Sequence, residues 1–384
     1  MGAGVVTPIG ADLETFWSAL LTGADGVSTI ERFPVDDLRV RRGGEIKKLP
    51  PRREAGAPDC RASQLLLAAA DDLLARAPLA AAPARMGVVV GTALGAVEEL
   101  EKALVSDRRA ARAAAGLYDA PARALARHLG ARGPVLTVST ACASGATAMG
   151  VAADLLRAGA ADLVVAGGYD ILCRFVMRGF DALRSLTRER VRPFDRRRSG
   201  LLLGEGAALV SMVRERDARR GWLGRLLGHA SGSDGAHITA PDPDGRGLEF
   251  SIRAAMAQAG VTAEALDLVN AHATGTPLND RIEAGVLGRV LGRRARQVPV
   301  NGIKGALGHT MGAAATLEAI MCLLASRHGS VPQTLGLEDP DPECDLDCVR
   351  GAPREAPTRV SLSTSLGFGG CNAALILEGA GPRP

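Results

Sequence analysis

The sequence has few aromatic residues and little excess charge. Its 384 residues include only seven Phe, two Tyr and two Trp, and 46 Lys and Arg stand against 42 Asp and Glu, for a net charge of +4. Proteins that bind single-stranded nucleic acid stack bases on aromatic side chains and follow the phosphate backbone with a basic groove. Both scarcities argue against nucleic acid as a partner.

Segments that target a chain to membranes are also missing. The longest uncharged stretch, residues 133–153, contains several Thr, Ser and Gly residues, which make a poor lipid-facing surface. The sequence opens MGAGVVTPIGADLETFW, without Lys or Arg and with two acidic residues, unlike the basic start of a secretory signal. We therefore expect no membrane span and a cytoplasmic location.

Motifs for disulfide frameworks, zinc and nucleotides are absent as well. The seven cysteines are an odd number scattered through a long chain, so each is predicted to be a free thiol. Cys344 and Cys348 form one tight pair, but no second pair follows, so we expect no zinc site. No glycine-rich run ends in Gly-Lys-Ser/Thr, and no GxGxxG joins a strand to a helix. Nucleotide binding therefore has no support.

What the sequence does contain is an alternation of apolar, strand-like runs with helical patterns. Its hydrophobic content of 47% predicts a folded chain, and its 384 residues suit two or three domains, or one large domain built by duplication. Runs such as VVV and LVV suit strands covered on both faces, as in an α/β protein. Strands are predicted at residues 86–94, 134–140, 161–168, 266–272, 297–303 and 360–368, and helices at 63–76, 146–158 and 312–326.

Two segments repeat the same order of features. Residues 135–158 and 298–325 each run from a strand through a turn to one reactive side chain and a Gly-Ala helix start. Cys142 lies three residues before Gly145, and His309 lies three residues before Gly312. A duplicated fold would bring this thiol and imidazole together, although turns rich in Gly and Ala can also resemble one another by chance.

The same residues are the best candidates for chemistry. A helix that begins near Cys142 would favour its thiolate and make it a nucleophile for acyl transfer, whereas the alternative is a small buried side chain that only packs. His272 and His309 both lie in loops that follow strands, where functional sites tend to form. A structural role for either histidine remains the alternative at this point.

Several longer motifs occur together in one order: GAGVVTPIGADLETFWSALLTG, VSTACASGATA, RPFDRRRSGLLLGEGAA, TAPDPDG, VNAHATGTPLND, NGIKGALGHTMGAA, PDPECDLD and SLGFGGCNAALIL. In these motifs the chain resembles the elongating β-ketoacyl-acyl-carrier-protein synthases, almost from end to end. The resemblance implies a thiolase-like α/β fold, duplicated and five-layered (α-β-α-β-α) with mixed sheets. We expect an N-terminal half at residues 1–229 that carries the cysteine and a C-terminal half at 230–384 that carries both histidines.

The resemblance also implies roles for individual residues. The catalytic set would be Cys142, His272, His309 and Lys304. The backbone N–H groups of Cys142 and Phe368 would form the oxyanion hole, and Phe368 would also gate the acyl pocket beside Gly369. Thr274 and Thr276 would contact a phosphopantetheine arm, Glu318 would be a supporting buried acid, and Arg198 would contact an acyl carrier protein. Neither a metal nor a cofactor is implied, because the phosphopantetheine arm belongs to the carrier-bound substrate.

The implied reaction is a decarboxylative Claisen condensation. An acyl group on Cys142 would react with malonyl-acyl-carrier protein to give 3-oxoacyl-acyl-carrier protein, in fatty acid, polyketide or polyene biosynthesis. The implied partners are an acyl carrier protein and a second copy of the chain. Two alternatives stay open: a ketosynthase-like subunit of a heterodimer that sets chain length, and a decarboxylating or acyl-transferring relative that does not elongate.

Some features depart from the family pattern. The chain begins at what is normally the loop after the first core strand, so we expect either that one strand is missing or that the start codon is misassigned. Ala273 replaces a glycine, and its methyl group is expected to crowd the path of the pantetheine arm. Cys371 stands where threonine or histidine is common, and residues 95–130, which normally help form the dimer interface and the acyl pocket, form a shorter stretch. These departures leave chain length and primer undetermined.

Overall fold

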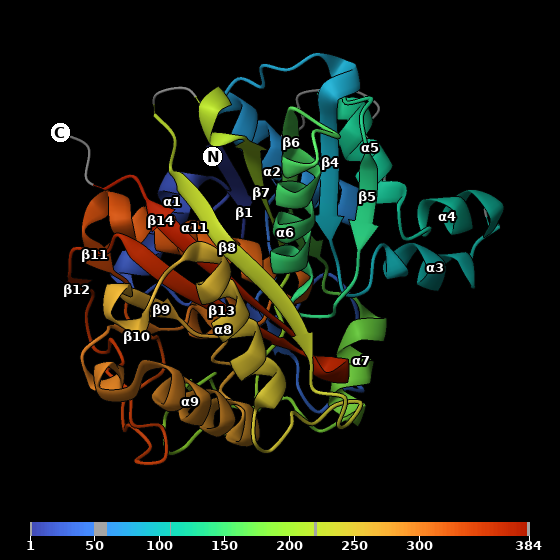
Figure 1. Cartoon of the computed structure of the whole chain (residues 1–384). Coiled ribbons are helices and arrows are strands. Elements are labelled where there is room, and N and C mark those ends of the chain that lie inside the picture. Colours follow the sequence, from blue (N-terminus) through green and yellow to red (C-terminus); the bar gives the residue numbers. More distant parts are fainter. Residues whose placement is uncertain (1, 50–59, 108, 219–220, 382–384) are drawn as a thin grey trace.

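The computed structural model describes residues 2–49, 60–107, 109–218 and 221–381. Its described part contains two mixed sheets of five strands each (Figure 1). The first sheet has the order β1 (Gly2–Val6), β7 (Gly206–Val213), β6 (Leu163–Asp170), β4 (Met86–Gly91) and β5 (Val135–Val138). The second has the order β10 (Val300–Asn301), β9 (Leu268–Asn270), β13 (Val360–Gly367), β14 (Cys371–Gly379) and β8 (Gly224–Ser233).

The two sheets have the same topology, which decides the question of duplication. In each sheet, the strands counted along the chain lie in the order third, second, fourth, fifth, first. Of the four pairings between neighbours in this order, the first two are parallel and the last two are antiparallel in both sheets. Chance similarity of two turns does not explain a shared strand order, so the repeat seen in the sequence is structural. We infer that the halves meet between β7 and β8, because a boundary at residue 229 would cut β8.

Helices cover and separate the sheets in five layers. The central layer holds α6 (Ser144–Arg157) and α11 (Ala314–His328), packed between the sheets. On the outer face of the first sheet lie α2 (Arg61–Arg76) and α5 (Ala120–Leu129). On the outer face of the second lie α8 (Arg246–Ala259) and α9 (Pro277–Leu291). The layers confirm the predicted thiolase-like arrangement.

The sequence of strand β4 is apolar throughout because both faces of the strand are buried. Val89 packs in the central core, whereas Val88 and Val90 pack in the outer core under α2 and α5. Successive side chains of a strand point to opposite faces, and both faces of this sheet are covered. An uninterrupted run of valines therefore replaces the polar-apolar alternation of a half-exposed strand.

The remaining described α-helices and β-strands are short or peripheral. They are α1 (Leu13–Thr22), α3 (Val97–Ala103), α4 (Arg109–Ala115), α7 (Arg174–Ala182), α10 (Lys304–Leu307) and two small pairs, β2 (Ser28–Thr29) with β3 (Arg42–Gly43) and β11 (Ser330–Val331) with β12 (Arg354–Glu355). Figure 1 shows α3 and α4 projecting from the body beside β5. Among the described helices, none has the length and apolar character needed to cross a membrane.

The expectation that the first strand is missing is wrong. Residues Gly2–Val6 form β1, which pairs antiparallel with β7. Its glycines disfavour a strand when they are considered locally, but Gly4 has a structural reason, since a Cβ there would lie 2.2 Å from the carbonyl oxygen of Ala69 in α2. The helix therefore packs directly on the backbone of this strand.

Glycine also sets how closely the two halves approach in the central layer. A Cβ at Gly145 in α6 would lie 2.6 Å from Oγ1 of Thr316 and 2.8 Å from the carbonyl oxygen of Gly312. Real Cβ atoms do not approach neighbours so closely, so only hydrogen fits at this position. The Gly-Ala helix start after Cys142 thus brings the first half against the loop that follows His309.

We predict that Gly145→Ala destabilises the fold by about 1–3 kcal/mol, because the added methyl group forces the halves apart. Gly288→Ala is the matched control, since Gly288 also lies in a helix but no described residue has an atom within 4 Å of its potential Cβ. Alanine there should be neutral or stabilising by up to about 1 kcal/mol. Urea unfolding of both variants measures the difference. Equal stability of the two variants would contradict this account of the interface.

Candidate active site

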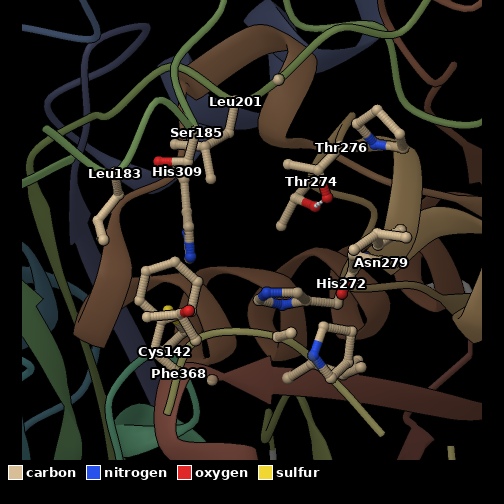
Figure 2. A pocket seen from close by; sticks show the side chains of 18 of the residues that line it. Cys142, Leu183, Ser185, Leu201, His272, Thr274, Thr276, Asn279, His309 and Phe368 are labelled. Atoms are coloured by element: carbon tan, nitrogen blue, oxygen red, sulfur yellow. Dashed lines mark hydrogen bonds between the residues drawn. The ribbon is translucent and has the colours of Figure 1, made fainter. Parts of the chain in front are cut away.

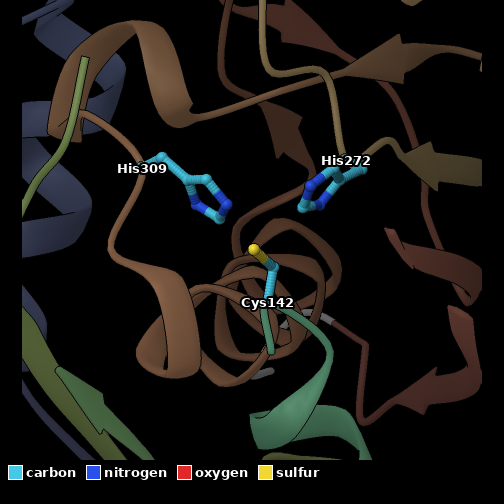
Figure 3. A group of neighbouring side chains, drawn as sticks. All are labelled: Cys142, His272 and His309. Atoms are coloured by element: carbon cyan, nitrogen blue, oxygen red, sulfur yellow. The ribbon is translucent and has the colours of Figure 1, made fainter. Parts of the chain in front are cut away.

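Cys142, His272 and His309 meet at one point between the two halves (Figure 3). Their sulfur and ring nitrogen ligand atoms all lie within 4.8 Å of one another, and all three residues are buried. The imidazole rings stand edge to face, with centroids 5.2 Å apart at 85°. Cys142 follows β5, His272 follows β9 and His309 follows β10 and α10, so the shared topology of the two sheets brings the three side chains together.

The loop before α6 positions Cys142. Ala141 adopts a left-handed φ of +49°, which turns the chain between β5 and the helix. The hydroxyl group of Ser144 accepts a hydrogen bond from the backbone N–H of Thr140 at 2.9 Å, and the N–H of Phe368 donates to the Cys142 sulfur. The sulfur thus lies between the first turn of α6 and the turn after β13.

The thiol is not a preformed thiolate. Burial raises the pKa of Cys142 to about 12, and the positive charge of Lys304 only partly opposes this shift. The sequence-based expectation that the helix start favours the thiolate is therefore wrong for the free protein. Loss of hydration around the sulfur is the largest cause of this shift, so the resting side chain is a neutral thiol.

Both imidazoles are neutral. Burial lowers the pKa of His272 and of His309 well below the usual range, and Lys304 lowers both further. The backbone N–H of Met311 donates to Nδ1 of His309 at 3.3 Å, which leaves the ring proton of His309 on Nε2. Among the described residues this buried Nε2 has no hydrogen-bond partner, so it can donate a hydrogen bond into the site.

Lys304 and Glu318 form a buried ion pair beneath the histidines. The Lys304 ammonium donates to Glu318 and to the backbone carbonyl oxygen of His272, and both side chains are almost fully buried. Burial raises the pKa of Glu318. The pair supports the loop of His272 and places positive charge near the thiol.

The distances alone would also suit a metal ion. Thiolate and imidazole are good ligands for zinc, but a ligand nitrogen must present a lone pair. The hydrogen bond from Met311 keeps the proton of His309 on Nε2, which makes that nitrogen a donor. The set is therefore better suited to binding a negatively charged oxygen than a cation.

Buried carboxylates that the sequence motifs did not single out hold the loops of the site. Glu283 accepts hydrogen bonds from the N–H groups of His272 at 2.7 Å and Ala273 at 2.8 Å. Asp170 accepts one from the N–H of Gly312, just after His309, at 2.6 Å. Burial raises the pKa of Glu283 to about 7 and of Asp170 to about 6. For Glu283, the signal in the sequence was its place near the start of the acidic helix that follows HATGT. Only the fold shows that this helix packs against the loop of His272.

A cavity of about 450 Å³ leads to the three reactive groups (Figure 2). Thr274 and Thr276 line it and share a hydrogen bond of 2.9 Å between their hydroxyl groups. Phe368 lies beside Cys142 and stacks on Phe180 from α7, with ring centroids 5.5 Å apart. Gly369 has φ +79° and its N–H donates to the carbonyl oxygen of Ile238, which ties the turn after β13 to the loop after β8.

Ala273 does not crowd this cavity, so that expectation is wrong. Ala273 is fully buried and is absent from the described cavity wall. Its methyl group points at Gly302, where an added Cβ would lie only 2.5 Å away. Ala273 keeps the left-handed φ of +47° that suits the family's glycine, while a glycine at position 302 makes room for the methyl group.

Arg198 is not available at the surface, which contradicts its predicted contact with a carrier protein. Its side chain is only 6% exposed and is paired with Asp341. The guanidinium also donates to the carbonyl oxygens of Thr276 and Pro277. Arg198 therefore supports the loop that carries Thr276, because burial between distant segments gives it partners that a charged motif cannot reveal.

Comparison with known proteins agrees with this geometry. Residues 1–218 match the family model "Beta-ketoacyl synthase, N-terminal domain", and residues 223–338 match "Beta-ketoacyl synthase, C-terminal domain". The chain is 38% identical to the tetracenomycin polyketide synthase ketoacyl synthase alpha subunit of Streptomyces glaucescens, over 98% of this chain and 95% of that protein. It is 34% identical to 3-oxoacyl-[acyl-carrier-protein] synthase 2 of a Synechocystis strain, over 98% and 96%.

Among solved structures, the ishigamide ketosynthase/chain length factor superposes with a TM-score of 0.91 at 33% identity, covering 99% of this chain and 98% of that one. The matched family models, the end-to-end relatives and the shared fold lead to one conclusion: the chain belongs to the β-ketoacyl synthase family and is an acyltransferase.

Proposed function

We propose that this protein condenses an acyl group held on Cys142 with malonyl-acyl-carrier protein, with loss of carbon dioxide, in fatty acid or polyketide biosynthesis. The observation that carries the proposal is the convergence of a buried thiol with the unpaired Nε2–H of His309 and the imidazole of His272. A nucleophile and a hydrogen-bond donor at one point are what acyl transfer followed by carbanion chemistry requires.

In the first half-reaction, the Cys142 sulfur attacks the thioester carbonyl of an acyl carrier. The C–S bond to the carrier breaks, the new C–S bond joins the acyl group to Cys142, and the thiol proton passes to the departing carrier sulfur. Backbone N–H groups of Cys142 and Phe368 would hold the tetrahedral oxyanion. Because the thiol is neutral at rest, this proton transfer accompanies the attack.

In the second half-reaction, malonyl-carrier occupies the same cavity. Its C–C bond to the carboxylate breaks, carbon dioxide leaves, and the electron pair forms an enolate of the carrier thioester. His309, through Nε2–H, and His272 would stabilise the enolate oxygen. The enolate carbon then attacks the acyl carbonyl, and the sulfur of Cys142 leaves and takes up one proton. The phosphopantetheine arm belongs to the substrate, so the proposal needs no resident cofactor.

We predict that the wild-type protein gains the mass of one acyl group when it is incubated with an acyl carrier, and that Cys142→Ala does not. Cys371→Ala is the control, because Cys371 lies near the same turn, at the start of β14, and has no role in the proposed reaction. Intact-mass spectrometry reads the adduct. An equal adduct on Cys142→Ala would remove Cys142 as the nucleophile.

Addition of malonyl-carrier to the acylated protein should then yield a 3-oxoacyl-carrier. Release of acetyl-carrier alone would instead support the relative that decarboxylates without elongating. That alternative was based on crowding by Ala273, and it loses this support because the methyl group of Ala273 packs against Gly302.

The raised pKa of Cys142 predicts an unusual pH dependence of alkylation. With a thiol pKa of about 12, the thiolate fraction and the rate of reaction with iodoacetamide should rise about tenfold per pH unit from pH 6 to 10. A cysteine in an unstructured model peptide, whose pKa is near the reference value of about 8.5, should level off above pH 9. Mass spectrometry of the peptide that contains Cys142 separates it from the other thiols. A plateau for Cys142 below pH 8 would contradict a neutral resting thiol.

We also propose that the face around β5 binds a second ketosynthase-like subunit. β5 ends the first sheet, and nearby apolar side chains are exposed, among them Val105 at 90% and Leu136 at 39%. An open strand edge next to exposed apolar groups is typical of a surface that a partner covers. The ketosynthase/chain length factor pair named for the ishigamide structure makes a heterodimer the alternative to a homodimer.

We predict that the purified chain is a dimer by light scattering and that Leu136→Asp converts it to a monomer, because a charge on the strand edge would be buried without a partner. Phe250→Asp is the control, since Phe250 is an exposed apolar residue on α8. A monomeric wild-type chain that dimerises only with a second ketosynthase-like subunit would favour the heterodimer.

A further inference from the structure

Arg184 is the one lysine or arginine among the described residues that line the active-site cavity. The two histidines in the same wall are neutral, because burial lowers their pKa values. Asp234, the acid in the wall, accepts hydrogen bonds from the N–H of Asp242 and the side-chain amide of Asn372. An anionic group that enters the cavity therefore has Arg184 as its cationic partner along the described wall.

The guanidinium of Arg184 is also free. Within the described ranges it makes no hydrogen bond and no ion pair, and its side chain is exposed. Asp181, the acid nearest to it along the chain, is bound by Arg39 at 3.2 Å. Most arginines of the neighbouring charged loop have acidic partners, as Arg197 has in Glu338, whereas Arg188, which does not line the described cavity, has none within the described ranges. Arg184 is thus an available charge in a region where most charges are paired.

The backbone at Arg184 is held in an uncommon conformation. Its φ is +53°, in the left-handed region that is unfavourable for a residue with a side chain and favours glycine or asparagine. The turn is fixed from both sides: the N–H of Arg184 donates to the carbonyl oxygen of Asp181, and the N–H of Leu201 donates to that of Ser185, both at 3.1 Å. The turn itself gives no reason for a long cationic side chain, and strained residues of this kind cluster at ligand contacts.

The position of this turn indicates what it contacts. Figure 2 shows its neighbours Leu183 and Ser185 on one side of the cavity and Thr274 and Thr276 on the other. Under the proposed function, the cavity admits a phosphopantetheine arm, a chain of amides that ends in a phosphodiester outside the reactive centre. Threonine hydroxyl groups suit the amides, and a guanidinium suits a phosphate because it can donate two parallel hydrogen bonds.

We propose that Arg184 binds the phosphodiester of the carrier's phosphopantetheine arm and so sets how deep the thioester reaches. This inference rests on the proposed function. It assigns the contact with the phosphodiester to Arg184 on the cavity wall. Arg198, the arginine that the sequence predicted to contact the carrier protein, is buried and paired with Asp341.

The experiment compares three donors of one butyryl group: butyryl-pantetheine, butyryl-4′-phosphopantetheine and the butyryl carrier protein. The rate of Cys142 acylation is measured by intact mass for the wild type, for Arg184→Gln and for Arg188→Gln. Arg188 is the matched control, because it is an exposed arginine on the same loop that does not line the described cavity. Glutamine keeps most of the length of the side chain and removes its charge.

For Arg184→Gln we expect a loss of about tenfold to a hundredfold in second-order rate constant with both phosphate-bearing donors, the effect of one charge-assisted contact. Butyryl-pantetheine should change by less than about threefold, Arg184→Lys should recover part of the loss, and Arg188→Gln should behave as wild type. Calorimetry should show that 4′-phosphopantetheine binds the wild type more tightly than pantetheine does, and that Arg184→Gln abolishes this difference.

An equal loss with all three donors would make Arg184 a structural residue of the wall, and an unchanged rate with the phosphate-bearing donors would exclude the contact. A loss confined to the carrier protein would assign Arg184 to the carrier's acidic surface. Each of these results overturns the phosphate proposal while Cys142 is still acylated. Failure of every donor to acylate wild-type Cys142 would overturn the proposed function itself.

Discussion

Burial of the reactive groups is the constraint on which the rest of the site depends. Cys142, His272 and His309 are all buried, and burial disfavours the charged form of each side chain. The thiol therefore stays protonated and both imidazoles stay neutral. A neutral imidazole with its proton on Nε2 can donate to an enolate oxygen. The low dielectric of a buried site strengthens that hydrogen bond.

The backbone N–H groups of buried loops need hydrogen-bond partners within the protein, and buried carboxylates provide them. Glu283 accepts from the two N–H groups at and after His272, Asp170 accepts from the loop after His309, and Asp280 accepts from the N–H groups of Phe194 and Gly275. Unpaired buried N–H groups would be costly, so each carboxylate satisfies a loop and fixes its path. Lys304 does the same for the carbonyl oxygen of His272.

The duplication explains why these loops meet. The residues that follow β5 in the first sheet meet those that follow β9 and β10 in the second, and α6 and α11 approach closely because only hydrogen fits at Gly145. Cys142 is carried by the first half, and His272 and His309 by the second. A change in the distance between the halves would therefore separate the thiol from the two imidazoles.

Strand periodicity is a local pattern, and it predicted the α/β class and the covered strands. The repeated spacing of Cys142 and His309 made these residues candidates, but their roles came only from the resemblance to the β-ketoacyl synthases. Tertiary structure alone decided that β1 is a strand, that the methyl group of Ala273 meets Gly302, that Arg198 is buried against Asp341, and that Glu283 holds His272. Each of these depends on packing between segments or on the way a helix folds back on a loop. Burial and pairing of that kind also set the protonation of the thiol and the imidazoles, since desolvation is a property of the assembled core and not of any motif.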